Sequence, residues 1–170
     1  MDMLIEAGYI EWQGSLRATY DKYLHPDVLD YDTQEMWDKI ENGEIYDLFQ
    51  FNTQIGVQSA KRIKPHSLND MATANSVMRL MVSGEDAEQP IDTYIRYKNN
   101  INEWYKDMHK YHLTDHEINI MEKYLKSSFG VGATQEDVMQ ICMDPEVAGF
   151  NVTLSNKLRK SIAKAFWRFL

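Results

Sequence analysis

The chain has a single cysteine, Cys142, and no run of 18 apolar residues in its length of 170. One thiol cannot close a disulfide within the chain, so the sequence excludes a disulfide-stapled secreted domain and favours a reducing, cytoplasmic setting. The lack of a long apolar run predicts no membrane span and no membrane partner. A Gly-rich phosphate loop, an HExxH signature and a Ser-His-Asp arrangement are also missing, so we assign no catalytic residue and no metal ligand.

Prolines are scarce, with four in the chain, and strand-like alternation is weak, whereas 44% of the residues are hydrophobic. This composition belongs to a globular protein, and the pattern predicts a mainly α fold of several packed helices with connecting loops. Four helix starts are expected where a capping side chain precedes an acid by three residues. These pairs are Asp32 with Glu35, Ser67 with Asp70, Thr114 with Glu117, and Thr134 with Asp137. We expect one further helix through residues 91–111, and a short helix or an extended connector over residues 44–52.

Carboxylates are absent from the last 20 residues, although the formal net charge of the chain is −8. Residues 1–50 hold twelve acids and three bases, whereas residues 151–170 hold five bases, which suggests a polyanionic partner at one end only. Helical spacing predicts an apolar face there that packs on a core, and a cationic face beside it. The apolar face is Leu154, Leu158, Ile162, Phe166 and Phe169; the cationic face is Lys157, Lys160, Lys164 and Arg168, with Arg159 on the flank. From spacing alone, the cations fit either phosphate binding or a solvated helix face.

Two other charged clusters have simpler interpretations. Lys61, Arg62 and Lys64 lie together in AKRIKP, a stretch that fits a surface turn. The carboxylates of residues 27–32 resemble a two-metal cluster, but isolated acidic runs are usually solvated. Asp32 is better used as a helix cap, so we do not assign a metal to this run.

Three histidines, His109, His112 and His116, invite a zinc interpretation. A helix that starts at Thr114 would separate them, and no nearby residue completes a tetrahedral ligand set. We therefore expect surface histidines. Cys142 lies among apolar residues and is interpreted as a packed thiol.

Five stretches carry a further signal because of their order and spacing. They are LFQFNTQIG (48–56), KPHSLNDMATANSVMRLM (64–81), PIDTYIRYKN (90–99), FGVGATQEDVMQI (129–141) and AGFNVTLSNKLRKSIAK (148–164). Together they resemble the bacterial family-C replicative DNA polymerases, that is, the alpha subunit of DNA polymerase III, and in particular phage-encoded versions. Three departures are Asn52, where relatives have an acid, Ala165, where relatives often have a second lysine, and NSVMRLM (75–81), which lacks the Pro-Gly-Pro of many cellular relatives.

The resemblance implies that the chain is part of a polymerase fingers domain. Residues 1–28 would be a connector from the palm side, and residues 29–170 would be a partial fingers domain. The positions that match the family's phosphate-binding region are Arg79, Arg159, Lys160 and Lys164, which would contact the triphosphate of an incoming dNTP. Gln135 and Glu136 would shape that pocket. Contacts to the DNA backbone are assigned to Lys61, Arg62, Lys64, Lys157 and Arg168.

By the same resemblance, the complete enzyme is a DNA-directed DNA polymerase, a nucleotidyltransferase that uses Mg²⁺. Its catalytic aspartates lie in the palm and match no residue of this chain, so we expect a fragment that is inactive alone and binds no metal. The implied partners are dNTP, primer-template DNA and a palm-bearing polypeptide, in the cytoplasm of a bacterial or phage-infected cell. The alternative is a non-catalytic helical interaction protein that docks through its C-terminal amphipathic helix.

Overall fold

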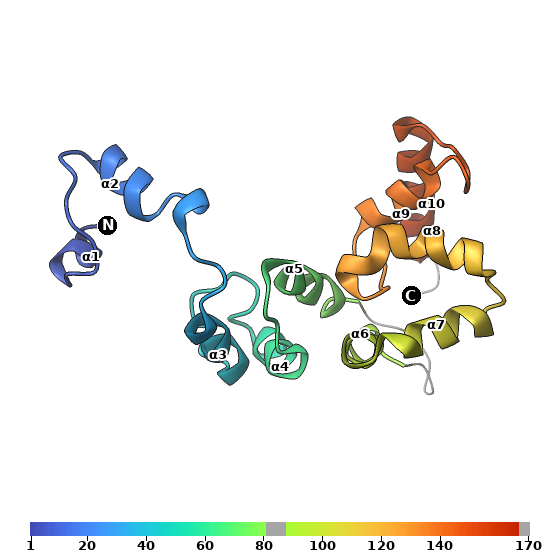
Figure 1. The fold of residues 1–170 in the computed structure, drawn as a ribbon, viewed down its shortest axis with the longest axis horizontal. Coiled ribbons are helices and arrows are strands. Elements are labelled where there is room, and N and C mark those ends of the chain that lie inside the picture. Colours follow the sequence, from blue (N-terminus) through green and yellow to red (C-terminus); the bar gives the residue numbers. More distant parts are fainter. Residues whose placement is uncertain (81–87, 167–170) are drawn as a thin grey trace. The chain divides into compact units, whose positions relative to one another are not determined.

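The computed structural model describes residues 1–80 and 88–166, the last four of these by their backbone alone, and every regular element in this part of the chain is a helix (Figure 1). The predicted mainly α class is therefore confirmed. The chain divides into two compact units, Met1–Met36 and Trp37–Leu170, called here unit 1 and unit 2. Over the described residues, no helix combines the length and the apolar character needed to cross a bilayer.

Unit 1 contains α1 (Asp2–Glu6), α2 (Leu16–Tyr23) and the 3₁₀ turn η1 (Pro26–Val28). The Ser15 hydroxyl caps α2 by accepting from the backbone N–H of Ala18 at 3.1 Å. The interior of unit 1 is very small, because Ile10 and Thr19 are its two buried residues.

The next helices are α3 (Gln34–Asn42), α4 (Gln54–Ile63) and α5 (Leu68–Val77). The predicted start of α3 at Asp32 is wrong, because the helix begins at Gln34 and the Asp32 N–H instead donates to Asp30 Oδ1 at 2.9 Å. The predicted cap of α5 is confirmed, since Ser67 Oγ accepts from the Asp70 N–H at 3.1 Å. Residues 44–52 form no helix, and the connector there is built of turns and a bend rather than being extended.

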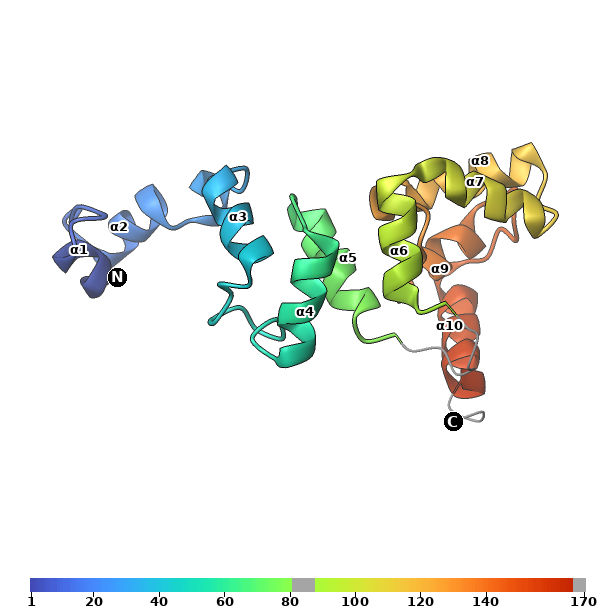
Figure 2. The same cartoon turned by 90° about the horizontal axis from the view of Figure 1, so that it is seen from below.

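The helix expected over residues 91–111 is two helices, α6 (Pro90–Asn99) and α7 (Ile101–Lys110), with the bend visible in Figure 2. Asn100 is extended, with φ −151° and ψ 96°, and ends α6 while it caps α7. Its side chain accepts from the Asn102 N–H at 3.2 Å. The single-helix prediction is wrong because asparagine is among the strongest helix caps, and this local hydrogen bond replaces helix continuation.

The last elements are α8 (Asp115–Leu125), the 3₁₀ turn η2 (Lys126–Ser128), α9 (Gln135–Met143) and α10 (Val152–Phe166). Complete capping boxes open α8 at Thr114 and α9 at Thr134, so both predicted starts are confirmed. After η2, Gly130 has φ +85°, a left-handed conformation that suits glycine.

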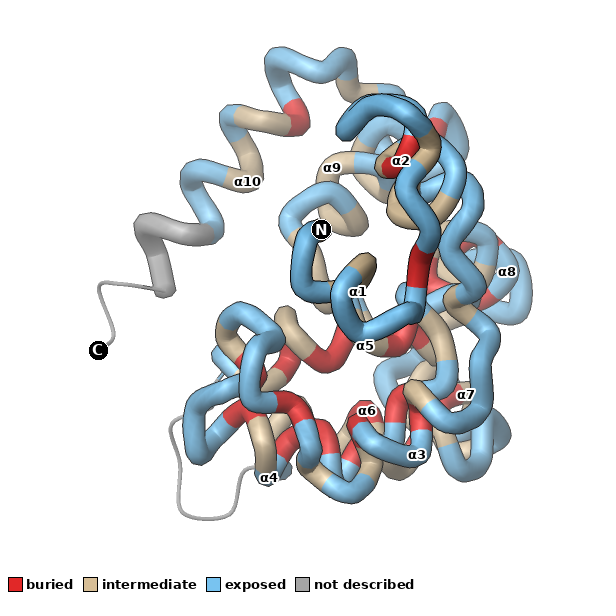
Figure 3. Tube along the Cα trace, turned by 90° about the vertical axis from the view of Figure 1, so that its left-hand side faces the viewer, coloured by how far each residue is buried: buried red, intermediate tan, exposed pale blue. Residues whose placement is uncertain are grey.

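The core of unit 2 has two parts. In the first, α4, α5 and α6 pack around Tyr94, which is fully buried, and small residues let these helices approach one another. Many of the positions drawn as buried in Figure 3 belong to these three helices. In the second, Trp104 of α7 packs with Tyr97 and Ile118. The Phe129 ring meets Tyr94 edge-on at 5.8 Å between centroids, so it joins the two parts.

Candidate functional site

The cationic helix α10 packs on α9, and its contact side is centred on Ser155, which is 1% exposed. The predicted apolar face packs only in part, because Leu158 is half-buried but Leu154 and Ile162 are 48% and 47% exposed. Figure 3 shows most of the described length of α10 as exposed. Helical periodicity predicts a helix here, but it does not tell which side of that helix a neighbour covers. The covered side is the one that carries the small residue Ser155, and the neighbour is α9. The side chain of Phe166 and all of Phe169 lie outside the described residues.

Arg159 is held on α10 by two neutral acceptors. Its Nε donates to Asn156 Oδ1 at 3.0 Å, and its Nη1 donates to Gln135 Oε1. Gln135 is the first residue of α9. The structure therefore brings together a predicted triphosphate ligand and a predicted pocket-shaping residue, and neither acceptor cancels the guanidinium charge.

The other described cations of α10, Lys157 and Lys160, are exposed. Within residues 1–80 and 88–162, no carboxylate pairs with either lysine or with Arg159. Glu136 is exposed on the first turn of α9 and makes no ion pair with these three cations. Of the remaining predicted site residues, the Lys164 side chain and Arg168 lie outside the described part of the chain.

Arg79 follows the end of α5, and its Nε donates to the carbonyl oxygen of Asn75 at 2.8 Å. Helix α5 packs with α4, α6 and η2, whereas α10 packs with α9. Among the described residues, no contact joins Arg79 to Arg159, so the structure does not assemble these two predicted ligands into one cluster.

The cations of residues 61–64 are largely neutralised within the chain. Arg62 pairs with Asp92, and Lys64 pairs with Glu41. Lys61 packs against Gly43, where an added Cβ would lie 2.4 Å from Lys61 Cε. The predicted surface turn is wrong for Lys61 and Arg62, which lie in the last turn of α4, and Lys64 is the C-cap of that helix. The pairs with Asp92 and Glu41 favour a structural role for Arg62 and Lys64 over DNA-backbone contacts.

A polar cluster that the sequence did not reveal lies where α4 ends and α5 and α6 meet. Lys98 Nζ donates to Asp70 Oδ2 at 2.8 Å and to the carbonyl oxygens of Lys64 at 2.8 Å and Ile63 at 3.1 Å. The Tyr94 hydroxyl donates to Asp70 Oδ1 at 3.1 Å. Burial, together with the adjacent Asp70 carboxylate, raises the pKa of Tyr94. The available signal was Lys98 one helical turn after Tyr94, on the same face of α6.

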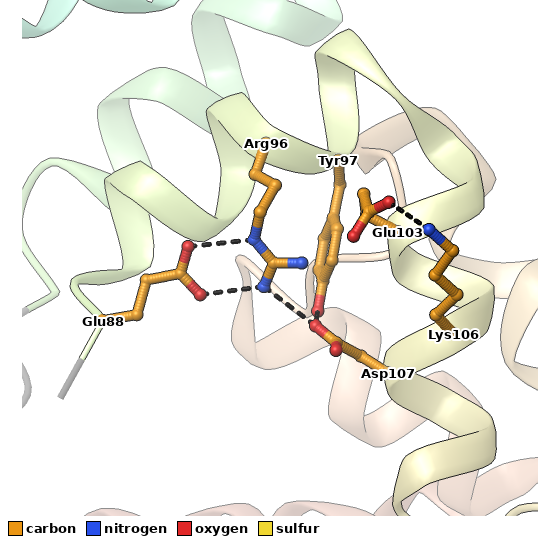
Figure 4. A network of polar contacts seen from close by, with 6 residues as sticks. All are labelled: Glu88, Arg96, Tyr97, Glu103, Lys106 and Asp107. Atoms are coloured by element: carbon orange, nitrogen blue, oxygen red, sulfur yellow. Dashed lines mark hydrogen bonds and ion pairs between the residues drawn. The ribbon is translucent and has the colours of Figure 1, made fainter.

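A second polar network spans the bend between α6 and α7 (Figure 4). Arg96 makes a bidentate contact with Glu88, at 3.0 Å and 2.8 Å, and its Nη2 also donates to Asp107 Oδ2 at 2.8 Å. The Tyr97 hydroxyl donates to the same Asp107 oxygen at 2.8 Å. The guanidinium lowers the pKa of both carboxyls, and its own pKa is raised. Burial and the hydrogen bond to Asp107 raise the pKa of Tyr97 to about 12. This arginine is already saturated by carboxylates, so it is a structural cation.

The three histidines stand apart, as the predicted helix break at Thr114 requires. His112 lies between α7 and α8 with φ +64°, and His116 Nε2 lies 3.0 Å from a Glu146 oxygen. His109 and His116 are more than half exposed. Over the described residues, no group of three or more His, Cys, Asp or Glu side chains is placed to hold a metal ion. Cys142 is half-buried.

Two cavities lie away from α10. One, of about 290 Å³, lies around Trp104 and Tyr105 of α7 and is mostly apolar, although Glu122 and Lys126 also line it. The other, of about 460 Å³, lies between α8 and α9 and includes His116 and Glu146. Neither contains a predicted site residue.

Comparison with known proteins finds similarity over nearly the whole chain. Residues 11–168 match the family model described as the bacterial DNA polymerase III alpha subunit finger domain. The chain is 54% identical, over 96% of its length, to a protein of Bacillus subtilis named probable DNA polymerase YorL and to the DNA-directed DNA polymerase of Bacillus phage SPbeta. It is 25% identical, over 85% of its length, to the DNA polymerase III subunit alpha of Deinococcus radiodurans. The chain spans 12% of the length of the two Bacillus relatives and 10% of the Deinococcus one.

Proposed function

Because the chain belongs to the finger domain family of the bacterial DNA polymerase III alpha subunit, we propose that α10 holds the triphosphate of an incoming deoxynucleotide during DNA replication. The catalytic centre lies on a palm-bearing polypeptide, and primer-template DNA is the second substrate. Residues 1–28 connect to the palm side, and residues 29–170 form part of the fingers. The setting is the cytoplasm of a bacterial or phage-infected cell, which is supported by the Bacillus and phage relatives.

The spacing of cations on α10 carries the proposal. Lys157, Arg159 and Lys160 lie on one helix within a few residues of one another, and none has an acidic partner among the described residues. Other described cations without a carboxylate partner, such as Lys61, Arg79, Lys110 and Lys126, are spread over other elements, whereas Arg62, Lys64, Arg96 and Lys98 each pair with a carboxylate. Solvated faces normally mix signs, so an unpaired row of one sign favours an external anion.

The chemistry of the row suits a triphosphate. A guanidinium contacts two phosphate oxygens at once, and an ammonium acts as a point charge. Fixed cations also stabilise the charge that develops on a pyrophosphate leaving group. Arg159 is pre-oriented by Gln135 and Asn156, which reduces the entropy lost when it binds an anion.

Mg²⁺ ligands are assigned to the palm-bearing polypeptide. The described residues of this chain bring no three potential ligands together, so they do not fit a metal site. The contribution of this chain is to bind and orient the nucleotide.

Nucleotide binding by the full chain tests the proposal directly. Lys160→Gln should weaken binding of dATP at least about tenfold in calorimetry, since a charge-assisted contact contributes about 1.5 kcal/mol or more. The matched control is Lys110→Gln, which removes an exposed lysine of α7 and should change the affinity less than about twofold. Binding should also weaken as salt screens the cations. Equal losses in the two variants would contradict a role for α10.

Primer extension tests the division of labour. The chain alone should extend no primer. Mixed with the SPbeta polymerase from which the matching segment has been removed, it should restore extension, and Lys160→Gln should restore less. Extension by the chain alone would refute its dependence on a palm-bearing polypeptide. Family membership does not favour the alternative of a non-catalytic interaction protein.

A further inference from the structure

The turn that leads from α9 into α10 is built around one residue, Asp144. Its backbone carbonyl oxygen accepts from the N–H groups of Val147, Ala148 and Gly149, at 3.0, 3.1 and 2.9 Å. Its side-chain Oδ1 accepts from the Glu146 N–H at 2.9 Å. Asp144 therefore sets the path of the chain between the two helices, and with it the direction in which α10 begins.

The same carboxylate ties this turn to α8. Its Oδ2 accepts from the Tyr124 hydroxyl at 2.7 Å and from Lys123 Nζ at 2.9 Å. The Asp144 side chain is 2% exposed, and a carboxylate withdrawn from water depends on such donors because it has lost its hydration. One side chain thus connects α8 with the end of α9 and with the turn before α10.

Apolar packing between α8 and α9 is incomplete. A cavity of about 460 Å³ lies between these helices, and Met121 of α8 and Ile141 of α9 are among the residues that line it. Side chains that border an open space lack contacts on that side, so they contribute less dispersion energy. The polar contacts of Asp144 therefore carry a larger share of the attachment of this turn to α8.

We infer that Asp144 is a positioning residue for nucleotide binding, which through Tyr124 and Lys123 holds α10 in the direction in which its cations meet the triphosphate. The inference rests on the proposed function, because it requires that α10 binds the nucleotide. Among the described residues, Asp144 pairs with Lys123 and with no cation of α10, so it acts through the backbone of the turn and not as a ligand.

Nucleotide affinity of the full chain tests the inference. Asp144→Asn keeps the size of the side chain but removes its charge. It should weaken dATP binding at least about fivefold in calorimetry, because the cations of α10 then lose more freedom when they bind. Each variant is assayed under conditions in which circular dichroism shows it to be fully folded.

The matched control is Asp70→Asn. Asp70 also accepts from a lysine and a tyrosine, Lys98 and Tyr94, but it lies on α5, which packs with α4, α6 and η2. The control should change dATP affinity less than about twofold, because sites without shared partners act independently. Equal losses of affinity in the two aspartate variants would overturn the inference, since general loosening of the fold would then explain both.

A milder pair of variants keeps the inference testable if an aspartate substitution prevents folding. Tyr124→Phe removes the hydroxyl that donates to Asp144, and Tyr94→Phe removes the hydroxyl that donates to Asp70. Tyr124→Phe should weaken dATP binding about threefold through the same loss of preorganisation. Tyr94→Phe should leave the affinity unchanged, and equal affinities in the two tyrosine variants would overturn the inference.

A distance measurement reads the direction of α10 without nucleotide. Spin labels are attached to Asn119→Cys on α8 and Ser161→Cys on α10, both at exposed positions, in a Cys142→Ser background. Asp144→Asn should shift or broaden the distribution of distances between the labels, whereas Asp70→Asn should leave it unchanged. An unchanged distribution in Asp144→Asn would overturn the inference.

The inference and the proposed function fail separately. Full dATP affinity in Asp144→Asn, together with a loss in Lys160→Gln, would overturn the inference and leave the proposed function. Full affinity in Lys160→Gln would remove the proposed function, and altered label distances in Asp144→Asn would still show that Asp144 directs α10.

Discussion

Lys98 Nζ lies 2.8 Å from Asp70 Oδ2, and the two side chains are 16% and 10% exposed. The same ammonium group donates to two carbonyl oxygens at the end of α4, those of Ile63 and Lys64. Helix ends leave such carbonyls without intrahelical partners. Lys98 therefore joins the end of α4 to the first turn of α5 through one side chain of α6.

Lys98→Met should lower the free energy of unfolding by about 3 kcal/mol, because it leaves the largely buried Asp70 carboxylate without its cation. Urea denaturation followed by circular dichroism measures the change. The matched control is Lys106→Met, whose ion pair with Glu103 is exposed and should contribute less than about 1 kcal/mol. Similar losses of unfolding free energy in the two variants would show that the buried ion pair stabilises the fold no more than the exposed one.

The bend at Asn100 gives a prediction about a single cap. Asn100→Ala removes the side-chain acceptor for the Asn102 N–H and should cost about 1 kcal/mol of unfolding free energy. Asn102→Ala removes an exposed amide one residue beyond Ile101 and should cost less than about 0.5 kcal/mol. Thermal denaturation of both variants measures the difference, and a neutral Asn100→Ala would mean that tertiary contacts alone hold the bend.

Helix starts that depend on a hydrogen bond between residues three positions apart could be predicted from the sequence. The boxes at Thr114 and Thr134, and the cap at Ser67, need only local partners, and all three form. The start of α3 was misplaced because Asp30 uses both of its oxygens locally and leaves the helix to begin at Gln34.

Features fixed by distant partners could not be predicted. The covered side of α10 depends on α9, so periodicity could not tell that Leu154 would be exposed and Ser155 buried. The Lys98 cluster joins residues up to 35 positions apart. The local spacing of Tyr94 and Lys98 places them on one face of α6 but does not identify Asp70 or the carbonyl oxygens of Ile63 and Lys64 as their partners. For the candidate site, the resemblance predicts roles for Arg159 and Gln135, and the structure shows a direct contact between the two side chains.

Gly130 meets Trp104 so closely that a side chain cannot be added without movement. A Cβ at Gly130 would lie 2.3 Å from Trp104 Cδ1, and Trp104 is 1% exposed. Gly130→Ala should therefore destabilise unit 2 by about 3 kcal/mol, through left-handed backbone strain and overpacking together. Gly149→Ala is the matched control, because Gly149 also has positive φ but its Cβ would meet Pro145 at an ordinary 3.8 Å.

The control should cost about 1 kcal/mol, the backbone contribution alone. Urea titration followed by tryptophan fluorescence measures both variants, and the Gly130 variant should also shift the emission as the indole moves. Equal losses at the two glycines would show that the core around Trp104 relaxes without cost.

Asp144 predicts how stability depends on acid. Its carboxylate accepts from the Tyr124 hydroxyl at 2.7 Å, from Lys123 Nζ at 2.9 Å and from the Glu146 N–H at 2.9 Å, and these contacts lower its pKa to about 2. Because the folded pKa lies below the unfolded value of about 3.9, the stabilisation is complete above about pH 4 and is lost as pH falls towards 2. Asp144→Asn should therefore lower the urea midpoint at pH 7 and reduce its fall between about pH 4 and 2. Asp115→Asn, at a carboxylate that is 92% exposed, is the control and should lower the midpoint at pH 7 far less. An unchanged acid profile in Asp144→Asn would mean that other carboxylates set the acid sensitivity of the fold.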